Sequence, residues 1–168
     1  ELIGEEISVP LFEDAPPAKI TKYLIESQGL QYDDFKFNYG KPFGRPKQIM
    51  ADFIMGKAQH VLLREPEASF ALEAIKRQKI AFSEISYGEL WNEANPGFGI
   101  FPNAGIIVKE ELYINYPEVM KVFEEELKEA IEWVNENRHE AAKLSFDMMR
   151  NSIEHVEAFI DRATFKYV

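Results

Sequence analysis

The sequence predicts an α/β fold in which a mainly parallel sheet is flanked by helices and is followed by a helical C-terminal segment. Strand-like and helix-like segments alternate at short intervals up to residue 82, and helical periodicity dominates from Pro117 onward. The chain has 168 residues, including 13 Phe, 7 Tyr and 2 Trp, which supply large apolar surfaces for a core. We therefore expect an ordered globular protein.

The first strand–helix pair lies between residues 7 and 29. Ile7–Val9 is predicted as a strand that stops at Pro10, because proline cannot continue a ladder inside a sheet. An acidic, proline-bearing loop follows. A helix then begins at Pro17 and is expected to end at Gly29, since proline suits the first turn and glycine the position just past a helix.

Two further units repeat this pattern. Phe35–Tyr39 alternates apolar and polar residues as a strand does, and Pro46 opens the next helix. Val61–Leu63 is a continuous apolar run, typical of a strand buried on both faces, and Pro66 opens a third helix. Ile80–Phe82 is predicted as a fourth strand. Parallel strands joined by helical crossovers carry helices on both faces of the sheet.

The later part of the chain changes character. Residues 86–101 are rich in glycine and proline and suit a connector, and Gly105–Val108 is a further strand candidate. A long amphipathic helix is predicted from Pro117, with an apolar stripe and a charged remainder. Two shorter helices follow, separated by a cap at Asn151–Ser152.

Composition and motifs exclude several functions. The formal charge of −10 disfavours nucleic acid as a partner, and no apolar run approaches the roughly 18 residues of a membrane span. The absence of cysteine removes thiol catalysis, disulfides and cysteine-bound zinc. His60, His139 and His155 lie far apart without metal-ligand spacing, and no nucleotide-binding or serine-nucleophile motif occurs. We expect neither a catalytic site, nor a metal site, nor a cofactor.

A candidate ligand site lies where the predicted strands end. The carboxyl ends of parallel strands share one edge of the sheet, and ligands bind in the crevice beyond that edge. The helix N-termini there favour an anionic group, arginines donate hydrogen bonds, aromatic rings sandwich a flat body, and carboxylates favour cations or amide donors. The candidates in the three loops are Phe12, Glu13, Asp14, Tyr39, Phe43, Arg45, Arg64 and Glu65. Equally, Glu65 can cap its helix and the arginines can pair with neighbouring carboxylates.

Several short segments, taken in order, carry a family resemblance: Leu2–Pro10, Leu24–Leu30, Phe53–Ala58, Leu63–Ser69, Asn115–Val119, Ala130–Asn137 and Glu140–Ala142. They resemble the second lobe of ABC-transporter solute-binding proteins, in the branch that captures nitrate, sulfonates, taurine or the thiamine pyrimidine precursor. The resemblance covers nearly the whole chain.

The resemblance implies a lobe of the type II periplasmic-binding-protein kind. Residues 1–100 would form the α/β solute-binding lobe, and residues 101–168 the returning strand and the helices that pack on a first lobe. The family function is capture of a small solute between two lobes and delivery to the subunits of an ABC permease, without catalysis. It implies a periplasmic or lipid-anchored location on a bacterial membrane. The chain is expected to be a truncated piece, and the fragment to form a dimer.

Residue roles carry over at a few positions. Glu65 and Pro66 match the cleft-lining Glu-Pro pair of the family, the Phe12–Ala15 loop takes the place of a solute-contacting loop, and Asn103 lies on the returning segment. The family usually has Gly, Ser or Thr where this chain has Glu13 and Asp14, and carboxylates repel oxyanions. We therefore expect a neutral or cationic solute, including heteroaromatic ones.

Two alternatives remain open from the sequence. The first is an enzyme of the related pyrimidine-precursor-synthase type, although this chain lacks the cysteine-rich segment on which that group depends. The second is the sensor domain of a signalling receptor, because similar lobes occur ahead of signalling domains.

Overall fold

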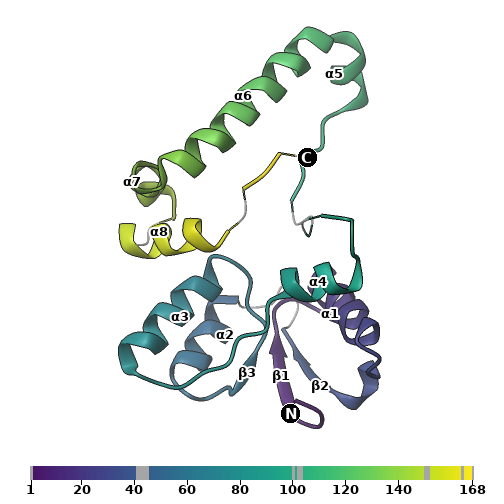
Figure 1. Ribbon diagram of the computed structural model, residues 1–168, viewed down its shortest axis with the longest axis vertical. Coiled ribbons are helices and arrows are strands. Elements are labelled where there is room, and N and C mark those ends of the chain that lie inside the picture. Colours follow the sequence, from purple (N-terminus) through teal and green to yellow (C-terminus); the bar gives the residue numbers. More distant parts are fainter. Residues whose placement is uncertain are drawn as a thin grey trace. The chain divides into compact units, whose positions relative to one another are not determined.

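A computed structural model shows two compact units, Glu1–Phe101 and Pro102–Val168 (Figure 1). The structure describes residues 2–40, 46–99, 101, 104–149, 152–163 and 165–167, without the side chains of residues 147 and 149. Each unit has its own set of elements and is described by itself.

The first unit is built on a three-stranded, all-parallel sheet. Its strands are β1 (Glu6–Val9), β2 (Lys36–Tyr39) and β3 (His60–Val61), in the order β2-β1-β3. β1 pairs along its whole length with β2, and the backbone N–H of Leu62 donates to the Ser8 carbonyl at 2.9 Å, which extends the contact with β3. The predicted α/β fold with a parallel sheet and flanking helices is thereby confirmed.

Four helices flank this sheet: α1 (Pro16–Ser27), α2 (Pro46–Ile54), α3 (Glu67–Gln78) and α4 (Tyr87–Ala94). The chain moves from β1 to β2 in one direction and then returns past β1 to reach β3. Right-handed crossovers in opposite directions place their helices on opposite faces of a sheet. Accordingly, α1 packs with α4 on one side of the strands and α2 packs with α3 on the other (Figure 1).

The helix boundaries follow the residues that the sequence indicated. Gly29 and Gly56 adopt φ angles of +74° and +71° just past α1 and α2, where a side chain would be strained. α3 instead ends at Lys79, whose φ is +58°. The core of the unit comprises Val9, Ala15, Ala18, Leu24, Ile49, Ala71, Leu72 and Ile75.

Two predicted strands are wrong. Residues 80–82 and 105–108 have no strand pairing, and Ile80, Phe82 and Ile107 are 48%, 40% and 97% exposed. The Ile80 N–H donates to the Ile75 carbonyl at 3.2 Å, so this residue completes the C-terminal turn of α3 instead of joining a ladder. A short apolar run alone does not distinguish a strand from a loop, because a strand also needs a neighbour with free backbone groups.

The connector predicted over residues 86–101 is in part a helix. α4 begins after Ser86, whose hydroxyl accepts a hydrogen bond from the Glu89 N–H at 3.4 Å. This N-cap outweighs the low helix propensity of Gly88. Tyr23 fixes α4 to α1, because its hydroxyl donates to Asn95 Oδ1 at 2.6 Å and its ring packs on Trp91.

The second unit is helical within its described residues. It contains α5 (Glu110–Asn115), which the sequence did not predict, and three predicted helices: α6 (Pro117–Glu136), α7 (Arg138–Met149) and α8 (Ile153–Arg162). The Ser152 hydroxyl caps α8 by accepting from the His155 N–H at 3.3 Å.

The packed part of the second unit is the pair of helices α7 and α8. Its buried cluster consists of Ala141, Ala142, Val156 and Ile160. At the surface, Arg138 Nη1 donates to Asp161 Oδ1 at 2.8 Å. Among the helices of both units, as far as residues are described, none combines the length and apolarity needed to cross a membrane.

Candidate functional site

The carboxyl ends of the three strands lie at the same edge of the sheet, as expected, because all three strands are parallel. Val9 is paired with Tyr39 at the last position of β1 and β2, and the Gly40 N–H donates to the Val9 carbonyl at 3.2 Å. The chain then turns toward α1 after β1 and toward α3 after β3, on opposite faces. This divergence is the topological switch point at which doubly wound sheets leave a crevice for ligands.

The loop after β1 presents its candidate residues to solvent. Pro10 and Ala15 are buried and hold the ends of the loop, while Glu13 and Asp14 are exposed and Phe12 is 48% exposed. The Ala15 N–H donates to the Phe12 carbonyl at 3.0 Å and closes a tight turn. The loop therefore holds one aromatic ring and two carboxylates outward at the carboxyl edge.

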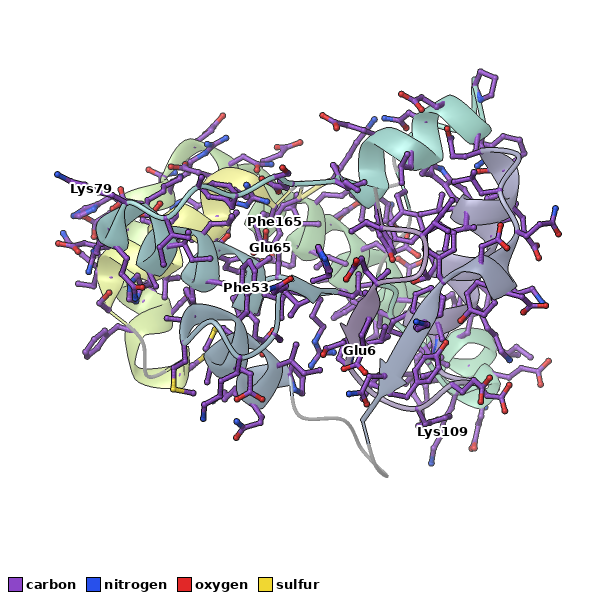
Figure 2. The ribbon with its side chains drawn as sticks, turned by 90° about the horizontal axis from the view of Figure 1, so that it is seen from below. Glu6, Phe53, Glu65, Lys79, Lys109 and Phe165 are labelled. Atoms are coloured by element: carbon purple, nitrogen blue, oxygen red, sulfur yellow. The ribbon has the colours of Figure 1, made fainter. Side chains whose placement is uncertain are left out.

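The loop after β3 engages its candidate residues in local contacts. One oxygen of the Glu65 carboxylate accepts hydrogen bonds from the Ser69 N–H at 3.1 Å and from the Ser69 hydroxyl at 2.6 Å. Arg64 Nε lies 3.8 Å from Glu67 Oε2. Glu65 and Lys79 mark the two ends of α3 in Figure 2. The capping and pairing roles that the sequence left open for Glu65 and Arg64 are therefore present.

Tyr39 lies at the end of β2 and interacts with Tyr32 and Glu13. Its hydroxyl shares a hydrogen bond with the Tyr32 hydroxyl. Burial, this hydrogen bond and the negative charge of Glu13 raise the pKa of Tyr39 above its usual value. Tyr39 is therefore an uncharged hydrogen-bonding group near a carboxylate.

An open hollow of about 230 Å³ brings two of the candidate residues together. It is lined by Glu13, Tyr32, Asp33, Phe35, Phe37 and Tyr39, and we call it the aromatic hollow. The Tyr32 and Phe37 rings stack with centroids 4.7 Å apart, and the Phe37 and Tyr39 centroids are 6.0 Å apart. Phe12, Asp14, Arg64 and Glu65 do not line it, and Phe43, Arg45 and Asn103 lie outside the described residues.

Four lining residues of the aromatic hollow were missed by the sequence analysis. Phe35 and Phe37 share a face with Tyr39 because alternate residues of a strand point the same way. This signal was available in the sequence. Tyr32 and Asp33 belong to a 3-10 turn, Tyr32–Asp34, that precedes β2, and no periodicity indicates that this turn folds against the strand.

A second tyrosine with a raised pKa, Tyr87, begins α4 and contacts α1. Thr21 Oγ1 donates to the Pro17 carbonyl at 2.7 Å, so the Tyr87 hydroxyl is the donor in its 2.6 Å contact with Thr21 Oγ1. Burial raises the pKa of Tyr87 to about 12. Tyr87 thus joins α4 to α1 as an uncharged group.

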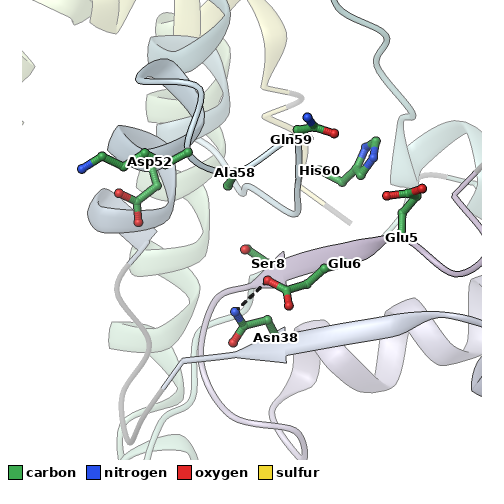
Figure 3. A pocket seen from close by; sticks show the side chains of 9 residues that line it. Glu5, Glu6, Ser8, Asn38, Asp52, Ala58, Gln59 and His60 are labelled. Atoms are coloured by element: carbon green, nitrogen blue, oxygen red, sulfur yellow. Dashed lines mark hydrogen bonds between the residues drawn. The ribbon is translucent and has the colours of Figure 1, made fainter.

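A larger hollow of about 370 Å³ lies at the opposite, amino edge of the strands (Figure 3). Its lining is mostly polar, and Asn38 Nδ2 donates to Glu6 Oε1 at 3.1 Å between β2 and β1 (Figure 3). The described residues contain no group of three or more His, Asp or Glu placed to hold a metal ion. Because ligands of doubly wound sheets bind at the carboxyl edge, we assign the candidate site to that edge despite the smaller volume there.

Comparisons of this chain with protein-family models, with curated proteins and with solved structures find no match.

Proposed function

We propose that this chain binds a small solute at the carboxyl edge of its sheet, without chemistry, as one lobe of a two-lobed binding protein that serves an ABC importer. The observation that carries the proposal is the strand order β2-β1-β3, which creates a switch point between the ends of β1 and β3. The exposed loop after β1 and the aromatic hollow beside it supply the contacting groups.

The second unit supports a two-lobed arrangement. One face of α6 carries Val119, Val122, Phe123 and Trp133, each at least 40% exposed. Exposed apolar side chains along one face of a helix favour burial of that face against another body. In our proposal that body is a second lobe, the whole lobe is of the type II periplasmic-binding-protein kind, and the protein is periplasmic or lipid-anchored on a bacterial membrane.

The charges at the carboxyl edge favour a neutral or cationic solute. Glu13 and Asp14 are exposed in the loop after β1, whereas the guanidinium of Arg64 already has Glu67 as a neighbour. An oxyanion at this position would meet two carboxylates at short range, where like charges destabilise binding. Solutes with amide or amine donors are therefore the expected class.

A thermal-unfolding screen of this chain against small solutes tests the proposal. We expect amines and neutral heteroaromatic compounds to raise the free energy of unfolding, because they bind only the folded state. At a free solute concentration ten times Kd, the increase should be about 1.4 kcal/mol. Nitrate and sulfonates should give no increase.

Two variants locate the effect. Phe12→Ala removes a ring that is 48% exposed in the loop after β1 and should reduce the stabilisation. Leu30→Ala, at a position past α1 that is 41% exposed, should leave the stabilisation intact. Stabilisation by anions alone, or by no compound while the protein is folded, would contradict the proposal.

A further inference from the structure

We infer that the solute carries an alkylated ammonium group and that this group is held in the aromatic hollow. This inference rests on the proposed function and names the chemical class of its ligand. Four aromatic rings and two carboxylates line the hollow, and both kinds of group attract an organic cation.

The rings of the aromatic hollow are held in place by the strand and by each other. Phe37 and Tyr39 occupy alternate positions of β2, and Phe35 directly precedes the strand; the Phe35 and Phe37 centroids lie 6.2 Å apart at an interplanar angle of 23°. Tyr32 stacks on Phe37 at 18° and is hydrogen-bonded to Tyr39 through its hydroxyl. All four residues are half-buried, so the rings are fixed while part of their surface remains open to a ligand.

The charged side chains that line the aromatic hollow are the carboxylates of Glu13 and Asp33. Both carboxylates are exposed, and among the residues that the structure describes no Lys or Arg lines the hollow. Tyr39 adds no charge of its own, since its pKa is raised. The formal charge of −10 for the whole chain adds a favourable long-range field for a cation.

The Tyr32 ring already accepts an ammonium group from this chain. Lys22 Nζ lies 5.6 Å from the centroid of the Tyr32 ring, within the range of a cation–π contact, and it also lies 3.9 Å from Glu26. Lys22 does not line the hollow. The contact shows that the ring is placed where a cation can reach it.

The chemistry of the lining distinguishes an organic cation from a metal ion. Hard metal ions require several oxygen ligands at short distance, whereas two carboxylates line this hollow and the described residues hold no group of three or more acidic or histidine side chains placed around a metal ion. An alkylated ammonium group spreads its charge over apolar methyl groups, which favour contact with rings and need no hydrogen-bond acceptors. A volume of about 230 Å³ accommodates such a group.

The test compares choline with 3,3-dimethylbutan-1-ol, a neutral molecule of nearly the same shape, by calorimetric titration of the whole chain. We expect choline to bind at least about threefold more tightly, because only the cation gains the cation–π and carboxylate attraction. Nuclear Overhauser contacts should connect the choline methyl protons with ring protons of the hollow.

Adjacent acidic residues provide a matched pair of variants. Asp33 lines the aromatic hollow and Asp34 does not, although both are exposed. Asp33→Asn should weaken choline binding by about threefold, and Asp34→Asn should leave it unchanged. Phe35→Leu should weaken choline binding by about fivefold through loss of a ring.

The outcomes separate this inference from the proposed function. Equal binding of choline and its neutral analogue, equal effects of the two aspartate variants, or no binding of choline would overturn the inference. The proposed function itself is contradicted by the wider solute screen, if that screen gives no stabilisation or stabilisation by anions alone.

Discussion

Replacing Ile75 by alanine is expected to lower the free energy of unfolding of the first unit by about 3 kcal/mol. Ile75 is 2% exposed and lies on the face of α3 that also buries Ala71 and Leu72. Removal of its side chain deletes apolar contacts and leaves a cavity that the helix pair α2 and α3 cannot fully close. Denaturant unfolding followed by the fluorescence of Trp91, in a Trp133→Phe background, measures this change for the first unit alone.

Ile80→Ala is the matched control, because it removes the same atoms five residues later. Ile80 is 48% exposed, so its truncation should change the free energy of unfolding by no more than about 0.5 kcal/mol. A large loss at Ile80 would mean that residues 80–82 are buried, as the mistaken strand prediction required. A small loss at Ile75 would show that α3 does not pack as described.

Val156→Asp is expected to unfold the helix pair α7 and α8. Val156 is 0% exposed and is enclosed by Ala141, Ala142 and Ile160, which offer no hydrogen-bond donor from their side chains. A buried carboxylate without a hydrogen-bonding partner lowers the free energy of unfolding by roughly 3 to 5 kcal/mol. We expect this loss to exceed the whole stability of a pair of short helices. Helical circular dichroism should fall, and the fluorescence of Trp133 should report the change.

Leu144→Asp introduces the same carboxylate on α7 at a position that is 71% exposed. We expect it to retain the helical signal, since the charge remains in water. If both variants lost the helices equally, the buried cluster would not be the source of their stability.

The parallel sheet was predictable because its segments carry several signals at once. Ile7–Val9 and Phe35–Tyr39 alternate apolar and polar residues, are followed by proline or glycine, and precede a helix of the right length. Ile80–Phe82 and Gly105–Val108 had apolar character alone, and both proved to be exposed loops. α4 was not predicted because Gly88 is typical of a loop, whereas the Ser86 side chain caps the helix and stabilises its first turn.

The part of the candidate site that is formed by the strands and by the loop after β1 was predictable from the parallel sheet. Parallel pairing brings Glu13 and Tyr39 to one edge, and strand alternation extends the aromatic face to Phe37. The contribution of Tyr32 depends on a turn that folds back on β2, which is a tertiary event without a local pattern. For Arg64 and Glu65 the sequence allowed ligand contact or local pairing, and only the distances show the local pairing.

Residue-level hydrogen–deuterium exchange tests most directly whether the carboxyl edge binds a solute. The measurement compares the free chain with the chain saturated by the solute that stabilises it most. We predict slower exchange at residues 11–15 and 32–40, around the loop after β1 and the aromatic hollow. Protection confined to residues 57–60, at the hollow on the amino edge, or no protection at all, would contradict this account.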